Sequence, residues 1–297
     1  MDTPSYYRKR FAQLKARYCH AHGCWNWDEF VTWITDLRPN LRPSTYRLYR
    51  AAIDQAIRDE HVANGPELSA RMRAPIQRST NMALRTSARK AKSLSQDDWL
   101  CLLRWLMDTP GRWNVAAARW LAWGVLTGLR PIEWRRAVLS ADHSNETGVM
   151  LHVQNAKCSH DRAHGPRRTL HLNLRQEDIQ DLAEFMRTVQ SSYAEAYEGC
   201  RRAVWRAAGV LWPNRRRRPS LYSSRHQFAA NAKAAGLLPE EIAAVMGHAI
   251  TGTHQCHYGK RRCGHAGMVA VQADPSDVAR VLARIGTNER PDVRAAM

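Results

Sequence analysis

The chain has 297 residues, of which 44% are hydrophobic, and its 45 Lys and Arg against 27 Asp and Glu give a formal net charge of +18. At about 150 residues per domain this length suggests two domains, and so much apolar material excludes wholesale disorder. The charge surplus favours a polyanionic partner. The longest mainly apolar run, residues 120–129, is far shorter than the roughly 18 residues of a membrane span, so we expect no membrane association.

The start of the chain and its cysteines predict a reducing compartment. Met1 to Pro4 lack the charged-then-apolar plan of a secretory signal, so we expect a cytoplasmic, nucleoid-associated protein. Seven scattered cysteines, an odd number, argue against a disulfide framework. Two clusters mimic metal sites without the paired C-x2-C spacing, and we expect no metal there. They are Cys19, His20, His22 and Cys24, and His254, Cys256, His257, Cys263 and His265.

Residues 1–77 are predicted to form a small helical bundle that is a binding unit of its own. Apolar residues recur at helical spacing over 6–18, 27–37 and 46–57. Prolines and glycine break the pattern at Pro39, Pro43 and Gly65-Pro66, and Ser44 is placed to cap the third helix. Five arginines are spaced along one side, where they either form a solvated surface or contact phosphates: Arg42, Arg47, Arg50, Arg71 and Arg73.

Residues 78–93 are predicted to form an extended basic linker, because they hold few large apolar side chains. Basic groups that can lie along a charged polymer here are Arg85, Arg89, Lys90 and Lys92. Residues 1–92 together contain 17 basic and 8 acidic residues, so half of the charge surplus lies in less than a third of the chain.

Residues 94–297 are predicted to form a second, mostly helical domain with a small antiparallel sheet. Ser95 fits a helix N-cap, and an alanine- and tryptophan-rich helix from about 113 to 128 should be buried and end at Gly128. Alternation over 149–153 and 170–172 predicts a two-stranded ribbon. Helices follow over 182–189, 204–208 and 228–232, then from Pro239 to Gly247. A last amphipathic helix begins near Pro275 and presents Val278, Val281, Leu282 and Ile285 on one face.

Three short stretches place phosphate-compatible side chains at helix boundaries. They are Thr127-Gly128-Leu129-Arg130-Pro131-Ile132-Glu133, then Ser223-Ser224-Arg225-His226-Gln227, then Met246-Gly247-His248 with Tyr258 ten residues after the histidine. Each alone has an ordinary explanation as a cap, an ion pair or a packing residue. Together, in this order and spacing, they resemble the tyrosine recombinase or phage-type integrase family over essentially the whole chain.

The resemblance implies an N-terminal core-binding domain, a linker and a catalytic domain whose site residues match by motif. Arg130 and Arg225 correspond to the catalytic arginines, His248 to the imidazole and Tyr258 to the nucleophile. Lys157, just after the first strand of the ribbon, corresponds to the lysine of the β-hairpin. Glu133 corresponds to the acidic support of the first arginine.

One position departs from the family pattern. The family usually has His or Lys three residues before the second arginine, and here that residue is Tyr222. A phenol can donate a hydrogen bond to phosphate but carries no positive charge at neutral pH. Slower activity, or partial compensation by His226 and nearby basic residues, is therefore expected.

The family chemistry explains these residue types. Two guanidiniums stabilise charge on the non-bridging oxygens of a phosphodiester, while Tyr258 attacks and a 5′-oxygen leaves. The resemblance implies a 3′-phosphotyrosine intermediate, no ATP and no metal or other cofactor. It further implies double-stranded DNA with a specific core site and a homo-tetramer on two duplexes, serving integration of a mobile element, dimer resolution or inversion. The alternatives are a type IB topoisomerase-like relaxase and a non-catalytic DNA-binding accessory protein.

Overall fold

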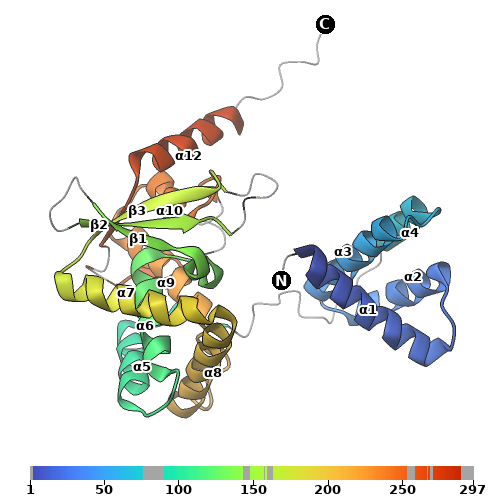
Figure 1. The fold of residues 1–297 in the computed structure, drawn as a ribbon, viewed down its shortest axis with the longest axis horizontal. Helices are drawn as coiled ribbons and strands as arrows, with labels where there is room; N and C mark the ends of the chain where they lie inside the picture. Colours follow the sequence, from blue (N-terminus) through green and yellow to red (C-terminus); the bar gives the residue numbers. More distant parts are fainter. Residues whose placement is uncertain are drawn as a thin grey trace, which may run out of the picture. The chain divides into compact units, whose positions relative to one another are not determined.

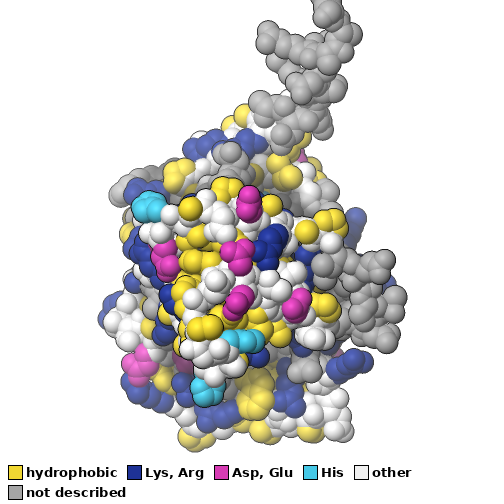
Figure 2. Space-filling model, turned by 90° about the vertical axis from the view of Figure 1, so that its right-hand side faces the viewer, with side chains coloured by type: hydrophobic (Ala, Val, Ile, Leu, Met, Phe, Trp, Pro, Cys, Tyr) yellow, Lys and Arg dark blue, Asp and Glu magenta, His cyan; other side chains and the backbone are white. Residues whose placement is uncertain are grey.

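The computed structural model describes residues 3–75, 90–142, 148–156, 158, 163–252, 258–265, 267 and 270–288. The chain divides into two compact units, Met1–Ala88 and Arg89–Met297, whose elements are labelled in Figure 1. The expected fold class, mainly helical with a small antiparallel sheet, is confirmed. Every helix in the described ranges is too short or too polar to span a bilayer. On the face drawn in Figure 2, Lys and Arg side chains are scattered and do not gather into a single patch.

The first unit is a helical bundle around an aromatic core. Its elements are α1 (Thr3–His22), α2 (Trp27–Asp36), η1 (Arg38–Asn40), α3 (Pro43–Asp59) and α4 (Gly65–Arg73). Asn26 caps α2 by accepting hydrogen bonds from the amides of Asp28 and Glu29. The Phe11 ring stacks on Trp27 with centroids 5.4 Å apart, and Phe30 at the centre is fully buried. Burial of these rings holds the helices together.

Two details of this bundle differ from the sequence prediction. The N-cap of α3 is Arg42, which makes no side-chain cap bond, so the prediction of Ser44 as the cap was wrong. Pro43 opens the helix instead, because proline at the first position loses an amide that has no helical partner. Gly65-Pro66 likewise opens α4.

The second unit surrounds a four-stranded antiparallel sheet in the order β1-β2-β3-β4. Its strands are β1 (Val138–Ala141), β2 (Gly148–Gln154), β3 (Arg167–Asn173) and β4 (Val271–Ala273). Its helices are α5 (Gln96–Asp108), α6 (Asn114–Thr127), η2 (Pro131–Arg136), α7 (Gln176–Ser191), α8 (Tyr193–Leu211), α9 (Leu221–Ala234), α10 (Pro239–Met246), η4 (Arg261–Cys263) and α12 (Pro275–Asn288). The predicted ribbon is confirmed as β2 and β3, which pair from Gly148 and Asn173 to Gln154 and Arg167. The prediction omitted β1 and β4, which pair on either side of it.

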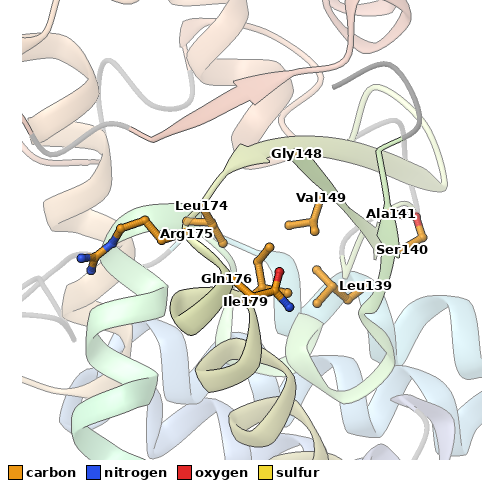
Figure 3. Close-up of a pocket in the computed structure, with 9 residues that line it drawn as sticks. All are labelled: Leu139, Ser140, Ala141, Gly148, Val149, Leu174, Arg175, Gln176 and Ile179. Atoms are coloured by element: carbon orange, nitrogen blue, oxygen red, sulfur yellow. The ribbon is translucent and has the colours of Figure 1, made fainter. Parts of the chain in front are cut away.

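A shallow hollow lies where the sheet meets the start of α7 (Figure 3). It has a volume of about 470 Å³ and is lined mainly by small and apolar residues of β1, β2 and α7. Leu139, Val149 and Ile179 are among them, whereas the predicted catalytic residues are not. This hollow is therefore separate from the site described below.

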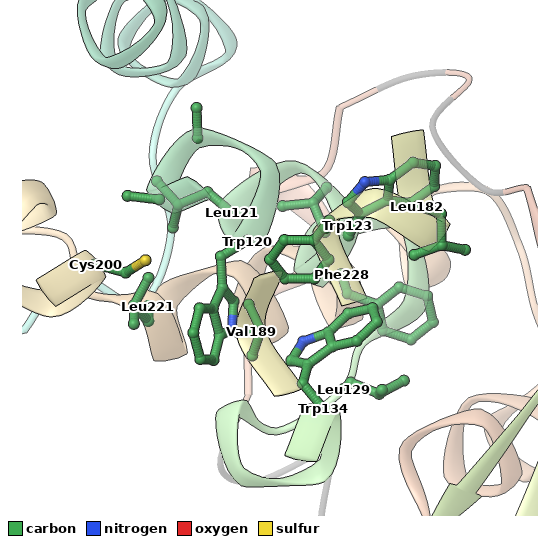
Figure 4. Packing of buried hydrophobic residues seen from close by; sticks show 14 of the residues in the cluster. Trp120, Leu121, Trp123, Leu129, Trp134, Leu182, Val189, Cys200, Leu221 and Phe228 are labelled. Carbon is green, nitrogen blue, oxygen red and sulfur yellow. The ribbon is translucent and has the colours of Figure 1, made fainter. Parts of the chain in front are cut away.

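The core of the second unit is built on α6, which is buried on nearly all sides. Trp120 and Trp134 pack edge to face against Phe185 of α7, at 5.9 and 5.1 Å between centroids. Figure 4 shows Trp120 and Trp134 in the same cluster of buried residues as Phe228. Helices α6 and α9 make extensive contact. This packing brings the end of α6 beside α9, and both segments carry predicted site residues.

The last helix, α12, is anchored at its start and packs on α10. Asp277 is buried and accepts hydrogen bonds from the Thr169 amide, at 2.9 Å, and from Arg280. Val281 is fully buried against Ala243 and Ala244 of α10. Leu282, predicted on the same apolar face, is instead 49% exposed, because only one narrow stripe of α12 meets α10.

Candidate active site

Arg130 is placed by the sharp end of α6. Gly128 has a φ of +67°, and a side chain there would meet the Phe228 ring 2.5 Å from its Cβ, so glycine is needed on both counts. After the turn, Glu133 accepts a 2.8 Å hydrogen bond from the Arg130 amide and a 2.6 Å bond from its Nη1. The Arg130 side chain is thereby held at the start of η2, where it is only 6% exposed.

Glu133 lies at the centre of the site, because its carboxylate faces three arginines. Oε2 accepts from Arg168 Nη2 at 2.8 Å and lies 3.8 Å from Arg225 Nη1, while Oε1 bonds Arg130. Burial alone raises the pKa of Glu133, but the charges of Arg168, Arg130 and Arg225 outweigh it and hold that pKa far below its usual range. Glu133 is therefore ionised at neutral pH.

Arg168 is a member of the site that the sequence prediction missed. It lies on β3, is fully buried, and donates through Nε to the Val245 carbonyl at 2.7 Å and through Nη1 to Asn155. The signal was the strand periodicity, since Arg168 shares the inward face with Leu170 and Leu172. A charged residue at an inward position requires a buried partner, which here is Glu133.

Arg225, on the first turns of α9, is fully buried and points its guanidinium at main-chain oxygens. Nη1 donates to the Gly128 carbonyl at 2.5 Å and Nη2 to the Met246 carbonyl at 2.6 Å. Its Nε faces the Tyr258 hydroxyl at 3.3 Å. Both terminal nitrogens of Arg225 thus hold the backbone of two neighbouring segments, and Nε is the nitrogen that faces Tyr258.

His248 follows the end of α10 at a second glycine that the geometry requires. Gly247 has a φ of +64°, and a Cβ there would lie 2.3 Å from the Asn155 side-chain oxygen. His248 Nε2 lies 2.9 Å from Arg225 Nη2. Because a guanidinium only donates, Nε2 is the acceptor and the ring proton is on Nδ1.

Tyr258 meets these groups through its hydroxyl. The Tyr258 and Tyr222 oxygens are 2.8 Å apart, and the Tyr258 ring lies 5.2 Å from that of His248. Burial tends to raise the pKa of Tyr258, but Arg225, the Tyr222 hydroxyl and Arg130 together lower it. For Tyr222, burial and its tyrosine neighbour raise the pKa to about 12. The pKa of Tyr258 is therefore lower than that of Tyr222.

The site carries a buried excess of positive charge. Three buried guanidiniums, Arg130, Arg168 and Arg225, share the single carboxylate of Glu133 within the described ranges. The Arg130 Nε is buried and has no hydrogen-bond partner among the described residues. Unbalanced buried cations and an unused donor favour binding of an anion, and the phosphate of a nucleic acid is one such anion.

Other predicted site residues are only partly covered by the structure. Lys157, Arg85 and Arg89 lie outside the described residues. The Ala156 amide, immediately before Lys157, donates to Glu133 at 3.3 Å, which ties this end of β2 to the site. Lys90 and Lys92 are exposed.

The five arginines of the first unit divide into two groups. Arg42 and Arg47 are exposed and Arg50 is half-buried, and within the described residues no ion pair engages them. Arg71 instead pairs with Asp28 at 2.8 Å, and Arg73 with Asp54 at 3.2 Å. The last two arginines therefore contribute to the bundle itself. The metal-like cluster near the C-terminus falls largely outside the described residues at His254, Cys256 and His257.

Comparisons with known proteins give structural neighbours only. No protein-family model matches, and no curated protein is similar in sequence. The fold is similar to XerH site-specific recombinase bound to palindromic difH substrate in a post-cleavage complex, with 14% identity and a TM-score of 0.47, covering 81% of this chain and 71% of that one. The pre-cleavage complex of XerH with difH gives 16% identity and 0.45, covering 79% and 67%. XerA recombinase gives 16% and 0.38, covering 96% of this chain and 93% of that one.

Proposed function

We propose that this protein is a site-specific DNA recombinase that cuts and rejoins DNA strands through a 3′-phosphotyrosine. The observation that carries the proposal is the Tyr258 hydroxyl within 3.3 Å of the Arg225 guanidinium, in a buried cluster with a surplus of positive charge. A nucleophile beside unbalanced cations suits attack on a phosphodiester. The motif order from Arg130 to Tyr258 supports the same chemistry.

In the proposed reaction, the Tyr258 oxygen attacks the scissile phosphorus and the 5′-oxygen leaves. Arg130, through its unused Nε, and Arg225, through the Nε that now faces Tyr258, hold the non-bridging oxygens. Glu133 keeps both arginines in place, and Lys157 supplies a proton to the leaving oxygen. The covalent bond retains the energy of the phosphodiester, so a second strand's 5′-hydroxyl reverses the step without ATP or metal.

The proposed partner is double-stranded DNA carrying a specific core site, bound as a tetramer on two duplexes. Recombination between two sites distinguishes this assembly from a relaxase, which acts on one duplex as a monomer. Site binding without any covalent product would indicate an accessory protein.

A suicide DNA substrate tests the proposal. A nicked duplex traps the covalent protein–DNA adduct, because the short fragment that carries the free 5′-hydroxyl diffuses away before religation. We expect an SDS-stable adduct with the wild type and with Tyr197→Phe, and none with Tyr258→Phe. Tyr197 is a suitable control because its hydroxyl makes no hydrogen bond within the described residues and its ring stacks on Tyr193, away from the site. An equal adduct with Tyr258→Phe would refute the assignment of the nucleophile.

A further inference from the structure

Tyr222 and Tyr258 form a hydrogen-bonded phenol pair inside the site. Their oxygens are 2.8 Å apart, a normal distance for an O–H donor and an oxygen acceptor. The two residues are 36 positions apart in sequence, on α9 and before η4, so the contact depends on the fold. Both rings are also close to His226 of α9, at 5.3 and 4.8 Å between centroids.

The surroundings decide which phenol donates. The Tyr258 oxygen also faces Arg225 Nε at 3.3 Å, and a guanidinium can only donate, so this oxygen is an acceptor. The pKa of Tyr222 is raised to about 12 by burial and by its neighbour, whereas Arg225, Tyr222 and Arg130 lower the pKa of Tyr258. Tyr258 therefore loses its proton first. Tyr222 keeps its proton and donates a hydrogen bond to the Tyr258 oxygen.

No described group next to the Tyr258 hydroxyl is placed to take its proton. Tyr222 remains a neutral phenol, and His248 Nε2 is already bonded to Arg225 at 2.9 Å. His226 is neutral, because burial and the charges of Lys92 and Arg225 lower its pKa to about 4. Its contact with Tyr258 is through the ring, with no hydrogen bond to the hydroxyl among the described atoms. The groups facing this oxygen are thus donors and cations.

We infer that Tyr222 is a positioning residue that activates the nucleophile by stabilising its phenolate, rather than by acting as a base. The inference rests on the proposed function. The Tyr258 proton passes to solvent before attack. The phenolate oxygen then forms the new P–O bond, the P–O5′ bond breaks, and the 5′-oxygen takes up a proton. Tyr222 keeps its own proton throughout.

A titration without DNA tests the hydrogen bond directly. In the protein labelled with ¹³C at tyrosine Cζ, the Tyr258 signal is assigned by its loss in Tyr258→Phe. We expect this signal to titrate at lower pH in the wild type and in Tyr197→Phe than in Tyr222→Phe. An unchanged titration of Tyr258 in Tyr222→Phe would overturn the inference. The result does not depend on cleavage, so it can fail while the proposed function stands.

The pH dependence of single-turnover cleavage gives the second test. In Tyr222→Phe the phenolate fraction falls, so we expect cleavage at pH 7 to slow by roughly ten- to a hundredfold, as for loss of a hydrogen bond to a charged group. The deficit should shrink as the pH approaches 10, where the phenol ionises unaided. Tyr222→His, which supplies a base, should add an inflection near pH 6.5. An equal loss at every pH in Tyr222→Phe would mean that the ring only packs, and would overturn the inference.

Discussion

Glu133 determines the electrostatics of the candidate site, because one carboxylate faces three guanidiniums in a region closed to water. Removing a buried charge from such a cluster costs more than the interaction itself is worth, since the remaining charges then repel one another without solvent between them. The carboxylate also bonds the Arg130 amide at 2.8 Å, so it fixes the backbone as well as the side chain.

Glu133→Gln is therefore expected to destabilise the second unit by about 3–5 kcal/mol, the cost of breaking a buried ion pair by removing one partner. Urea unfolding followed by tryptophan fluorescence measures the loss. The control is Glu184→Gln, which removes an exposed carboxylate that pairs with Arg119 at 3.1 Å and should cost less than about 1 kcal/mol. An equally small loss of unfolding free energy in both variants would contradict the central role of Glu133 in this ion-pair cluster.

The stability difference between the wild type and Glu133→Gln should depend on pH in a defined direction. The pKa of Glu133 is lowered in the folded protein, so its stabilisation is complete above the unfolded value of about 4.3 and is lost as the pH falls below it. The difference in unfolding free energy between wild type and Glu133→Gln should therefore narrow in acid. A difference that grows below pH 4 would have the wrong sign.

Among the individual residues of the candidate site, some were predicted from the sequence and others were missed, for identifiable reasons. Arg130, Arg225, His248 and Tyr258 were found by motif order, and the structure brings them together. Arg168 was missed because Arg167 beside it is also basic, and only the inward position of Arg168 on β3 distinguishes the two. The use of both Arg225 terminal nitrogens by carbonyl oxygens could not be predicted, since it depends on how α6, α9 and α10 meet.

Among the elements, α12 is connected to the site through a buried chain of hydrogen bonds. Asp277 accepts from the Thr169 amide and contacts His164 Nε2 at 2.9 Å, and His164 Nδ1 faces the His248 carbonyl at 3.2 Å. Hydrogen bonds from His164 and the Thr169 amide lower the pKa of Asp277 despite its burial. The position of His248 therefore depends on these hydrogen bonds at the start of α12.

Asp277→Asn keeps the shape of this side chain and removes its charge. We expect the amides of α12 to lose protection from hydrogen exchange by at least about tenfold, because charged hydrogen bonds are the stronger ones. Cleavage of the suicide substrate should slow in parallel. Mass spectrometry of exchange in α12 peptides makes the measurement. Glu177→Gln, an exposed acid in the first turn of α7, should change neither quantity.

The elements that the sequence failed to predict are the short ones. Strands β1 and β4 have four and three residues, too few to show a period of two, and they exist because β2 and β3 offer free edges to pair with. Helix α6, by contrast, was predicted to within about two residues, whereas only residues 204–208 of α8 were predicted. The sequence alone did not predict that α12 packs on α10, because this follows from tertiary contacts at Asp277 and Val281.

For the molecule as a whole, the net charge of +18 predicts binding to DNA that weakens steeply with salt. Each phosphate neutralised should steepen the slope of log affinity against log salt by about 0.9. Of the five arginines singled out in the first unit, Arg42, Arg47 and Arg50 have no ion pair among the described residues, whereas Arg71 and Arg73 are held by Asp28 and Asp54. The first three are therefore the proposed phosphate contacts of that unit.

Replacing Arg42, Arg47 and Arg50 together by Gln should lower DNA affinity and reduce the salt slope by up to about 2.7, if each contacts one phosphate. Fluorescence anisotropy with a labelled duplex at several salt concentrations gives both quantities. The matched control is Arg201→Gln, which removes one exposed charge that is already bonded to Glu198 at 2.6 Å and should leave the slope nearly unchanged. A triple variant with the wild-type slope would show that these three arginines do not contact the DNA backbone.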